Sequence, residues 1–88
     1  MDRFHFHIED GQSYPDAEGS VLADLAAARR QSLRVLTEAV LAAPQEFWST
    51  GCFRVTVTDQ EGLALFCLIL TAQDAPCVSR PGRAAPAP

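Results

Sequence analysis

The sequence feature that most constrains the fold is an uninterrupted apolar run near the end of the chain, from Leu63 to Leu70. The run has the length of a β-strand, and a strand that is apolar on both faces has to be covered on both faces. A chain of 88 residues offers one long helix, which covers one face of a sheet. The other face then has to meet the C-terminal tail, a second copy of the chain or another protein.

Two further segments alternate between apolar and polar residues, which is typical of half-buried strands. The first covers residues 4–9, and the turn signal Asp10-Gly11 follows it, so residues 12–14 can form a short return strand. The second covers residues 53–58, and a turn over residues 59–62 leads into the apolar run. The last two strands therefore form an antiparallel hairpin.

The spacing of small and apolar residues predicts one long helix from Asp24 to Ala43, with Asp24 as its N-cap, or Ser20 if the helix begins earlier. Pro44 disfavours a helical conformation at Ala43, and residues 45–48 can add one further turn. The expected buried stripe consists of Leu25, Ala28, Ser32, Leu36, Ala39, Val40 and Ala43. The chain is thus predicted to be an α+β domain, with a small antiparallel sheet of three or four strands and one long helix packed on one face.

Composition divides the chain into a single domain, residues 1–74, and a flexible tail, residues 75–88, that is rich in proline, alanine and arginine. The formal net charge of the whole chain is −4, and the tail holds two arginines and no acidic residue. The domain is therefore more acidic than the chain as a whole. Because such a body repels a phosphate backbone, nucleic acid is not the expected partner.

The three cysteines, Cys52, Cys67 and Cys77, are odd in number and lack the spacing of a disulfide framework. Free thiols favour a reducing compartment. The first ten residues lack the apolar stretch of a secretory signal, and no apolar run approaches the roughly 20 residues of a membrane span. We expect a cytoplasmic protein with no membrane partner.

Several short motifs recur in an order and spacing that is typical of a known family. They are Phe4-His5-Phe6-His7, Asp10-Gly11, Pro15-Asp16-x-Glu18-Gly19, Leu22-x-Asp24-Leu25, Ala27-Ala28-Arg29 and Val57-Thr58-Asp59-x-x-Gly62. Over nearly all of residues 1–71 the chain resembles the short bacterial proteins catalogued as domain of unknown function 6894. The resemblance implies a compact α+β domain and no catalytic residues. A fainter similarity to antitoxins of the HicB type extends only to shared strand–turn–helix geometry, which says nothing of function.

Two histidines are the candidate metal ligands. His5 and His7 leave the same face of the first strand, and with Cys52 or Cys77 they could hold zinc or copper. A Cys–His nucleophilic pair would be the corresponding enzyme hypothesis. The favoured reading is that both histidines are polar residues on the solvent face of a half-buried strand, with no cofactor and no enzymatic activity.

Arg29, Arg30 and Arg34 form a candidate basic patch on the helix, which could bind nucleic acid or an acidic partner and would make the chain an antitoxin-like or nucleic-acid-binding regulator. The favoured interpretation is a solvated helix face. Phe47 and Trp48 follow the helix, where they could be a recognition pair; the favoured reading is that they plug the open end of a small core.

Even the simplest interpretation of the apolar run requires that it contact the tail or another protein chain. If the run is a central strand its second face needs cover, and if it is an edge its unpaired backbone invites another strand. We therefore expect a homodimer or a small protein partner, unless the tail folds back over the strand. The expected interface residues are Leu63, Leu65, Phe66, Leu68 and Ile69.

Overall fold

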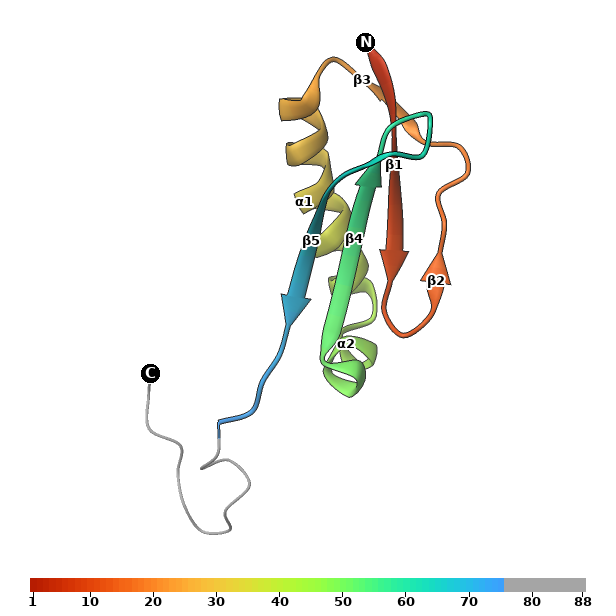
Figure 1. Ribbon diagram of the computed structural model, residues 1–88. Helices are drawn as coiled ribbons and strands as arrows, with labels where there is room; N and C mark the ends of the chain where they lie inside the picture. Colours follow the sequence, from red (N-terminus) through yellow and green to blue (C-terminus); the bar gives the residue numbers. More distant parts are fainter. Residues whose placement is uncertain (76–88) are drawn as a thin grey trace, which may run out of the picture.

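A computed structural model describes residues 1–75 and contains one antiparallel sheet with two consecutive helices packed on it (Figure 1). The strands are β1 (Asp2–Glu9), β2 (Ser13–Tyr14), β3 (Ser20–Leu22), β4 (Cys52–Thr58) and β5 (Ala64–Thr71). The helices are α1 (Leu25–Ala42) and α2 (Pro44–Thr50). The predicted α+β class is confirmed. Of the predicted tail, only Ala75 lies within the described residues.

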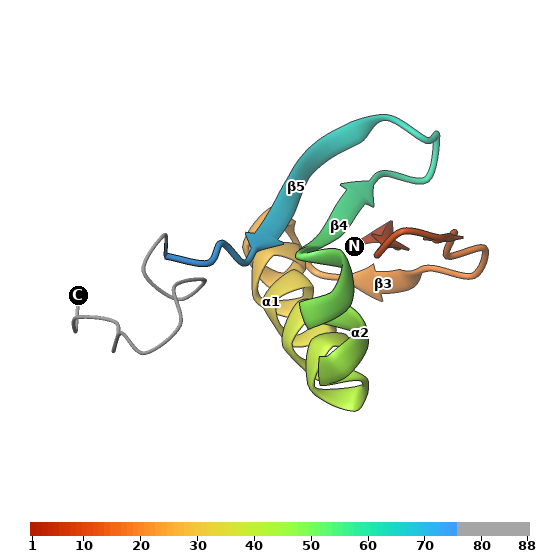
Figure 2. The same cartoon turned by 90° about the horizontal axis from the view of Figure 1, so that it is seen from below.

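The strand order along the sheet is β2-β1-β4-β5, and every pairing is antiparallel. The central pair consists of β1 and β4, with Phe6 opposite Val57 and Ile8 opposite Val55. Strand β3 pairs with the first residues of β1, where Arg3 faces Val21. Seen from below, both helices lie on the same side of the sheet (Figure 2).

The sheet has five strands, one more than the upper limit of the prediction. The additional strand is β3, which has three residues. A segment this short is below the length at which alternation can be recognised, and its residues read instead as the approach to the helix. The return strand after Asp10-Gly11 and the additional turn after Pro44 are both present, as β2 and α2.

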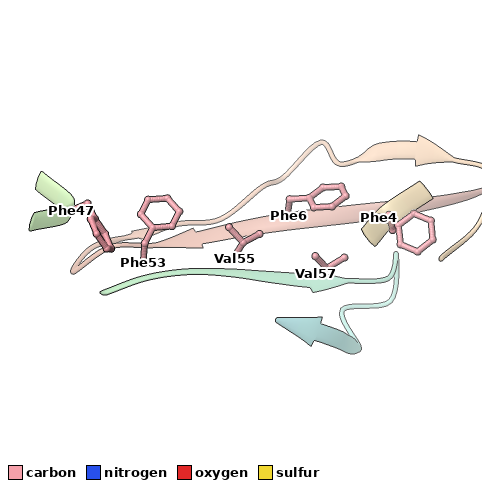
Figure 3. Close-up of a cluster of buried hydrophobic side chains, with 7 residues drawn as sticks. Phe4, Phe6, Phe47, Phe53, Val55 and Val57 are labelled. Carbon is pink, nitrogen blue, oxygen red and sulfur yellow. The ribbon is translucent and has the colours of Figure 1, made fainter. Parts of the chain in front are cut away.

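The core lies between α1 and the β1–β4 pair. Its buried hydrophobic residues are Phe4, Phe6, Ala28, Phe47, Phe53, Val55 and Val57, and six of them are labelled in Figure 3. The members from β1 and β4 follow period-two spacing, which places them on the same face of the sheet (Figure 3). Alternation in the sequence therefore identified the covered face correctly.

Small residues allow α1 to approach this face closely. Ala28 and Ser32 are fully buried, and the Ser32 hydroxyl donates to the carbonyl of Arg29 at 2.7 Å, so burying it leaves no polar atom unsatisfied. Leu25 was expected in the buried stripe but is 39% exposed. It is the first residue of α1 and lines an open pocket with Phe4 and Leu65.

The ends of the helices follow the predicted signals. The Asp24 carboxylate accepts the N–H of Ala27 at 2.9 Å and caps α1. Helix α1 ends at Ala42, and Pro44 occupies the first position of α2. Gly51 ends α2 in the left-handed conformation, with φ of 72°, and its N–H donates to Phe47 at 2.7 Å. This turn delivers the chain into β4.

Candidate functional site

Strand β5 is an edge strand. Within the described residues it pairs with β4 along one side and with nothing along the other, as its position at the end of the sheet in Figure 1 shows. The sequence alone is compatible with a central or an edge position for this strand, and the structure places it at the edge. An edge strand presents a row of unpaired N–H and C=O groups, which is a template for pairing with a further strand.

The two faces of β5 have different environments. Phe66 and Leu68 lie opposite Val57 and Val55 of β4, and paired residues share a face, so both point towards the helices and are half-buried. Ile69 lies opposite Arg54 on the other face of the sheet and is 53% exposed. The predicted interface residues therefore do not form one continuous face.

The start of β5 is irregular. Thr58 lies opposite Ala64 and Val57 lies opposite Phe66, so Leu65 is an extra residue at a β-bulge. Leu65 is 39% exposed, and Leu63, at 64% exposure, lies in the turn before the strand. The regular part of the edge begins at Phe66.

One hydrogen bond fixes which backbone groups of β5 point outward. The N–H of Ala72 donates to the carbonyl of Gly51 at 2.9 Å, which makes these two residues a hydrogen-bonded pair that continues the β4–β5 register. Because hydrogen-bonded and non-hydrogen-bonded pairs alternate in an antiparallel ladder, Cys67, Ile69 and Thr71 direct their N–H and C=O groups away from β4. Their side chains lie on the face without helices.

Two further edge residues were missing from the predicted interface. Cys67 and Thr71 are exposed, and both belong to the outward-directed set. Leu70 is also 37% exposed although it lies on the helix side. Cys67 and Leu70 belong to the apolar run, so the sequence held the signal for them, whereas the direction of the backbone groups depends on the pairing partner.

A second polar cluster surrounds His5, His7 and Asp16. The two imidazole rings are stacked, with centroids 6.0 Å apart. The backbone N–H of Asp16 donates to Nδ1 of His7 at 3.0 Å, so the other ring nitrogen carries the proton and donates to Oγ1 of Thr58 at 3.0 Å. Nδ1 of His5 donates to the carbonyl of Asp16 at 2.8 Å. The histidines thus hold the loop after β2 against β1.

The Asp16 carboxylate completes the attachment. Its oxygens accept the N–H of Phe6 at 3.1 Å and the N–H of Gly19 at 3.0 Å. Burial raises the pKa of Asp16, but the hydrogen bonds from Gly19 and Phe6 and the proximity of His5 outweigh it, so the pKa lies below its ordinary value. This carboxylate was part of a recognised motif, yet its partners could not be identified without the fold.

The histidines and the cysteines of the described region do not converge. Both ring nitrogens of His7 are engaged in hydrogen bonds, and residues 1–75 contain no group of three or more metal-ligating side chains. Cys67 is in the same cross-strand row as His7, two strand spacings or about 10 Å away. Cys52 lies four residues from that row, about 13 Å along β4. Cys77 is outside the described residues, and the metal hypothesis stays a prediction.

The members of the predicted arginine patch point in different directions, and so do those of the predicted aromatic pair. Arg29, Arg30 and Arg34 are exposed on α1, but Arg29 points about 100° away from Arg30 around the helix. Phe47 is buried in the core, as expected of a plug, and Trp48 beside it is 68% exposed. Neither feature forms a single surface.

Three comparisons with known proteins bear on this chain. A protein-family model matches residues 3–71, and its description is Domain of unknown function (DUF6894). No curated protein and no solved structure matches the chain. In the described residues, neither helix combines the length and the apolar character needed to cross a membrane.

Proposed function

The chain belongs to the family described as Domain of unknown function (DUF6894), and from that premise we propose that it is a small, non-enzymatic protein-interaction module that self-associates through β5. The observation that carries the proposal is the combination of an unpaired edge with exposed apolar side chains on it. Ile69 and Leu70 point to opposite faces and are 53% and 37% exposed, so neither face of the strand is fully covered.

The edge also lacks the usual protection against pairing. Edge strands are commonly guarded by charged side chains or by proline, and between Glu61 and Asp74 this chain has neither. The bulge at Leu65 guards only the start of the strand. A second copy of the chain offers the same uncharged edge, so two copies are complementary without any further adaptation.

The proposed setting is the cytoplasm of a bacterial cell. Cys52 and Cys67 are both exposed free thiols, which a reducing compartment preserves. The expected partner is a second copy or another small protein that presents a strand. The proposal includes no metal, no cofactor and no nucleic acid.

The native mass in solution tests this proposal. We expect light scattering of the full chain, with a reductant present, to give the mass of a dimer at micromolar to millimolar concentration. The variant Ile69→Glu should give the mass of a monomer, and the control Leu41→Glu should leave the dimer intact because Leu41 is 75% exposed on α1, away from β5. A wild-type monomer at millimolar concentration would contradict self-association.

A further inference from the structure

The geometry of the β5 edge points to one particular arrangement of the two copies. We infer that β5 pairs antiparallel with β5 of a second copy, with Ile69 on the twofold axis, so that two sheets join into one. The inference rests on the proposed self-association and goes beyond it, because it specifies the register.

The direction of the backbone groups limits the possible registers. Only Cys67, Ile69 and Thr71 of the regular edge direct N–H and C=O groups outward, as the bond from Ala72 to Gly51 fixes. A twofold arrangement must place members of this set opposite one another. The axis can therefore pass through any one of the five residues from Cys67 to Thr71.

The register centred on Ile69 uses the regular edge most fully. It places Ile69 opposite Ile69 of the second copy, and Cys67 opposite the second copy's Thr71 in both directions. Every outward-directed residue then exchanges both of its bonds. The registers centred on Cys67 or Leu68 instead place Ile69 or Thr71 opposite Leu65, whose backbone is displaced from the ladder by the bulge. The registers centred on Leu70 or Thr71 place Cys67 or Ile69 opposite Gln73, which lies beyond the end of the strand at Thr71.

The side chains match in this register on the face that carries the helices. Leu68 meets Leu70 of the second copy, and the reciprocal contact forms on the other side of the axis. In each copy Leu68 lies beside Val55 and Leu70 lies beside Phe53. The apolar row of one sheet thus continues into the apolar row of the other. Leu70, which is 37% exposed in the single copy, then contacts Leu68 of the second copy.

The opposite face is compatible with the same register. Ile69 of each copy meets its symmetry mate, and Arg54 flanks Ile69 within its own sheet. Arg54 lies 4.0 Å from Glu9, so the arginine has a partner of opposite charge. The two copies of Arg54 would be three strand spacings apart, about 14 Å, which exceeds the screening length of about 10 Å at 0.1 M salt.

The apolar surface available is adequate for such a contact. This surface includes three residues of β5, namely Leu65, Ile69 and Leu70. Leu33 of α1, which is 55% exposed, adds to them. It lies on the flank of the helix opposite Ala42, and Ala42 faces the β1–β2 side. The three residues of β5 lie on both faces of the strand, and together with Leu33 of α1 they expose on the order of 400 Å² in each copy, an area comparable to that of patches that mark interaction sites. With the strand backbones included, the two copies together bury about 1,000 Å², the size from which a specific interface becomes credible.

Cysteine cross-linking distinguishes the five registers. In a full-length background with Cys52, Cys67 and Cys77 replaced by serine, one variant restores Cys67 alone, a second carries Ile69→Cys and a third carries Thr71→Cys. All three positions belong to the outward-directed set, so they are geometrically matched. With a copper–phenanthroline oxidant, dioxygen accepts the two electrons and two protons that are released when two thiols form one disulfide.

We expect the Ile69→Cys variant to cross-link with itself, and the Cys67 variant to cross-link with the Thr71→Cys variant when the two are mixed. Each of these yields should exceed that of the same samples in 8 M urea at least tenfold. Self-cross-linking of the Cys67 variant would overturn the inference in favour of the register centred on Cys67. Cross-linking of Cys67 to the Ile69→Cys variant would overturn it in favour of the register centred on Leu68. Cross-linking of the Ile69→Cys variant to the Thr71→Cys variant would overturn it in favour of the register centred on Leu70, and self-cross-linking of the Thr71→Cys variant in favour of the register centred on Thr71.

The two proposals can fail separately. A dimer by light scattering with none of the six cross-links above the urea level would overturn edge pairing and leave self-association through another surface. A monomer by light scattering would remove both proposals together. The native mass of each cysteine variant is therefore measured first by light scattering. Cross-linking is interpreted only for variants that retain the native circular dichroism spectrum.

Discussion

Gly19 is the residue whose replacement the structure tolerates least among the glycines of the turns. Its φ is +71°, and a Cβ built on it would lie 2.8 Å from the carbonyl oxygen of Phe4 and 2.9 Å from Cε1 of His5. A left-handed conformation is costly for any other residue, and here there is also no space for the methyl group. The motif glycine before β3 is thus required by the close approach of the loop to β1.

A pair of glycine substitutions tests this directly. Gly62 has a φ of +88° with open space around it, so Gly62→Ala should cost about 1 kcal/mol for the conformation alone. Gly19→Ala should cost about 3 kcal/mol, because the clash with the Phe4 carbonyl is added. Urea titrations followed by circular dichroism measure both. Equal losses for the two variants would mean that the loop moves away from β1 without cost.

Asp16 makes stability depend on pH in the acidic range. Its pKa in the folded chain lies below the unfolded value of about 3.9, so ionised Asp16 favours the folded state. This contribution is fully present above pH 4 and is lost as the pH falls through the folded pKa. In Asp16→Asn the part of the pH dependence below pH 4 should diminish, and stability at pH 7 should fall by about 1–2 kcal/mol.

The matched control for Asp16 is Asp2→Asn, since Asp2 is exposed and accepts no hydrogen bond in the described structure. Urea titrations at several pH values between 2 and 7 provide the comparison. A control that loses as much of the acid-range dependence as Asp16→Asn would show that overall charge, and not the bonds from Phe6 and Gly19, is responsible.

At the scale of elements, β5 combines two roles on one strand. Phe66 packs against the core from the helix side, whereas Ile69 lies on the face without helices. The same strand is thus part of the fold on one face and available for contact on the other. This explains why its sequence lacks the alternation that marks β1 and β4.

Charged substitutions on the two faces should have different consequences. Phe66→Glu places a carboxylate against the core and removes an aromatic contact, which should cost at least about 3 kcal/mol and unfold a domain of this size. Ile69→Glu lies beside Arg54, so the folded monomer should lose less than about 1 kcal/mol. Thermal and urea unfolding at low micromolar concentration compare the two. If both variants are unfolded, the outer face of β5 is also required for the fold.

At the scale of the whole molecule, two helices cover one face of the sheet and the structure describes no layer on the other (Figure 2). The uncovered face is kept polar over β1 and β4 by His5, His7, Arg54 and Thr56, whereas Cys67 and Ile69 lie on it at the β5 edge. Val21 of β3, at 48% exposure, is a further apolar residue on this face, at the other side of β1. The proposed dimerisation at the β5 edge would add stability without altering the monomer.

This predicts a melting temperature that rises with protein concentration. Because a dimer unfolds to two chains, each tenfold increase in concentration adds about 1.4 kcal/mol per dimer, which corresponds to about 4 °C. Calorimetry of the wild-type chain at 0.02, 0.2 and 2 mM, with a reductant, measures the effect. Ile69→Glu should melt at the same temperature throughout, and a constant wild-type value would contradict a dimer coupled to folding.

The sequence by itself determined the elements whose signals are local. Alternation identified β1 and β4 and their buried faces, Asp24 and Pro44 marked the start and end of α1, and the turn over residues 59–62 was recognised by residue type. Together these signals were sufficient for the α+β class and for the position of the core. They depend on side-chain periodicity and backbone preference, which act over a few residues.

Only the tertiary structure decided which strand is the edge and which partners each polar group has. A continuous apolar run is the same in a central and in an edge strand, because the difference lies in hydrogen bonds to a neighbour distant in sequence. Strand β3 was too short for periodicity to reveal, and three of the four hydrogen bonds of Asp16 connect it to residues of β1 about ten positions away. The outward direction of Ile69 follows from its pairing with β4, and it is this pairing that turns an apolar run into a candidate interface.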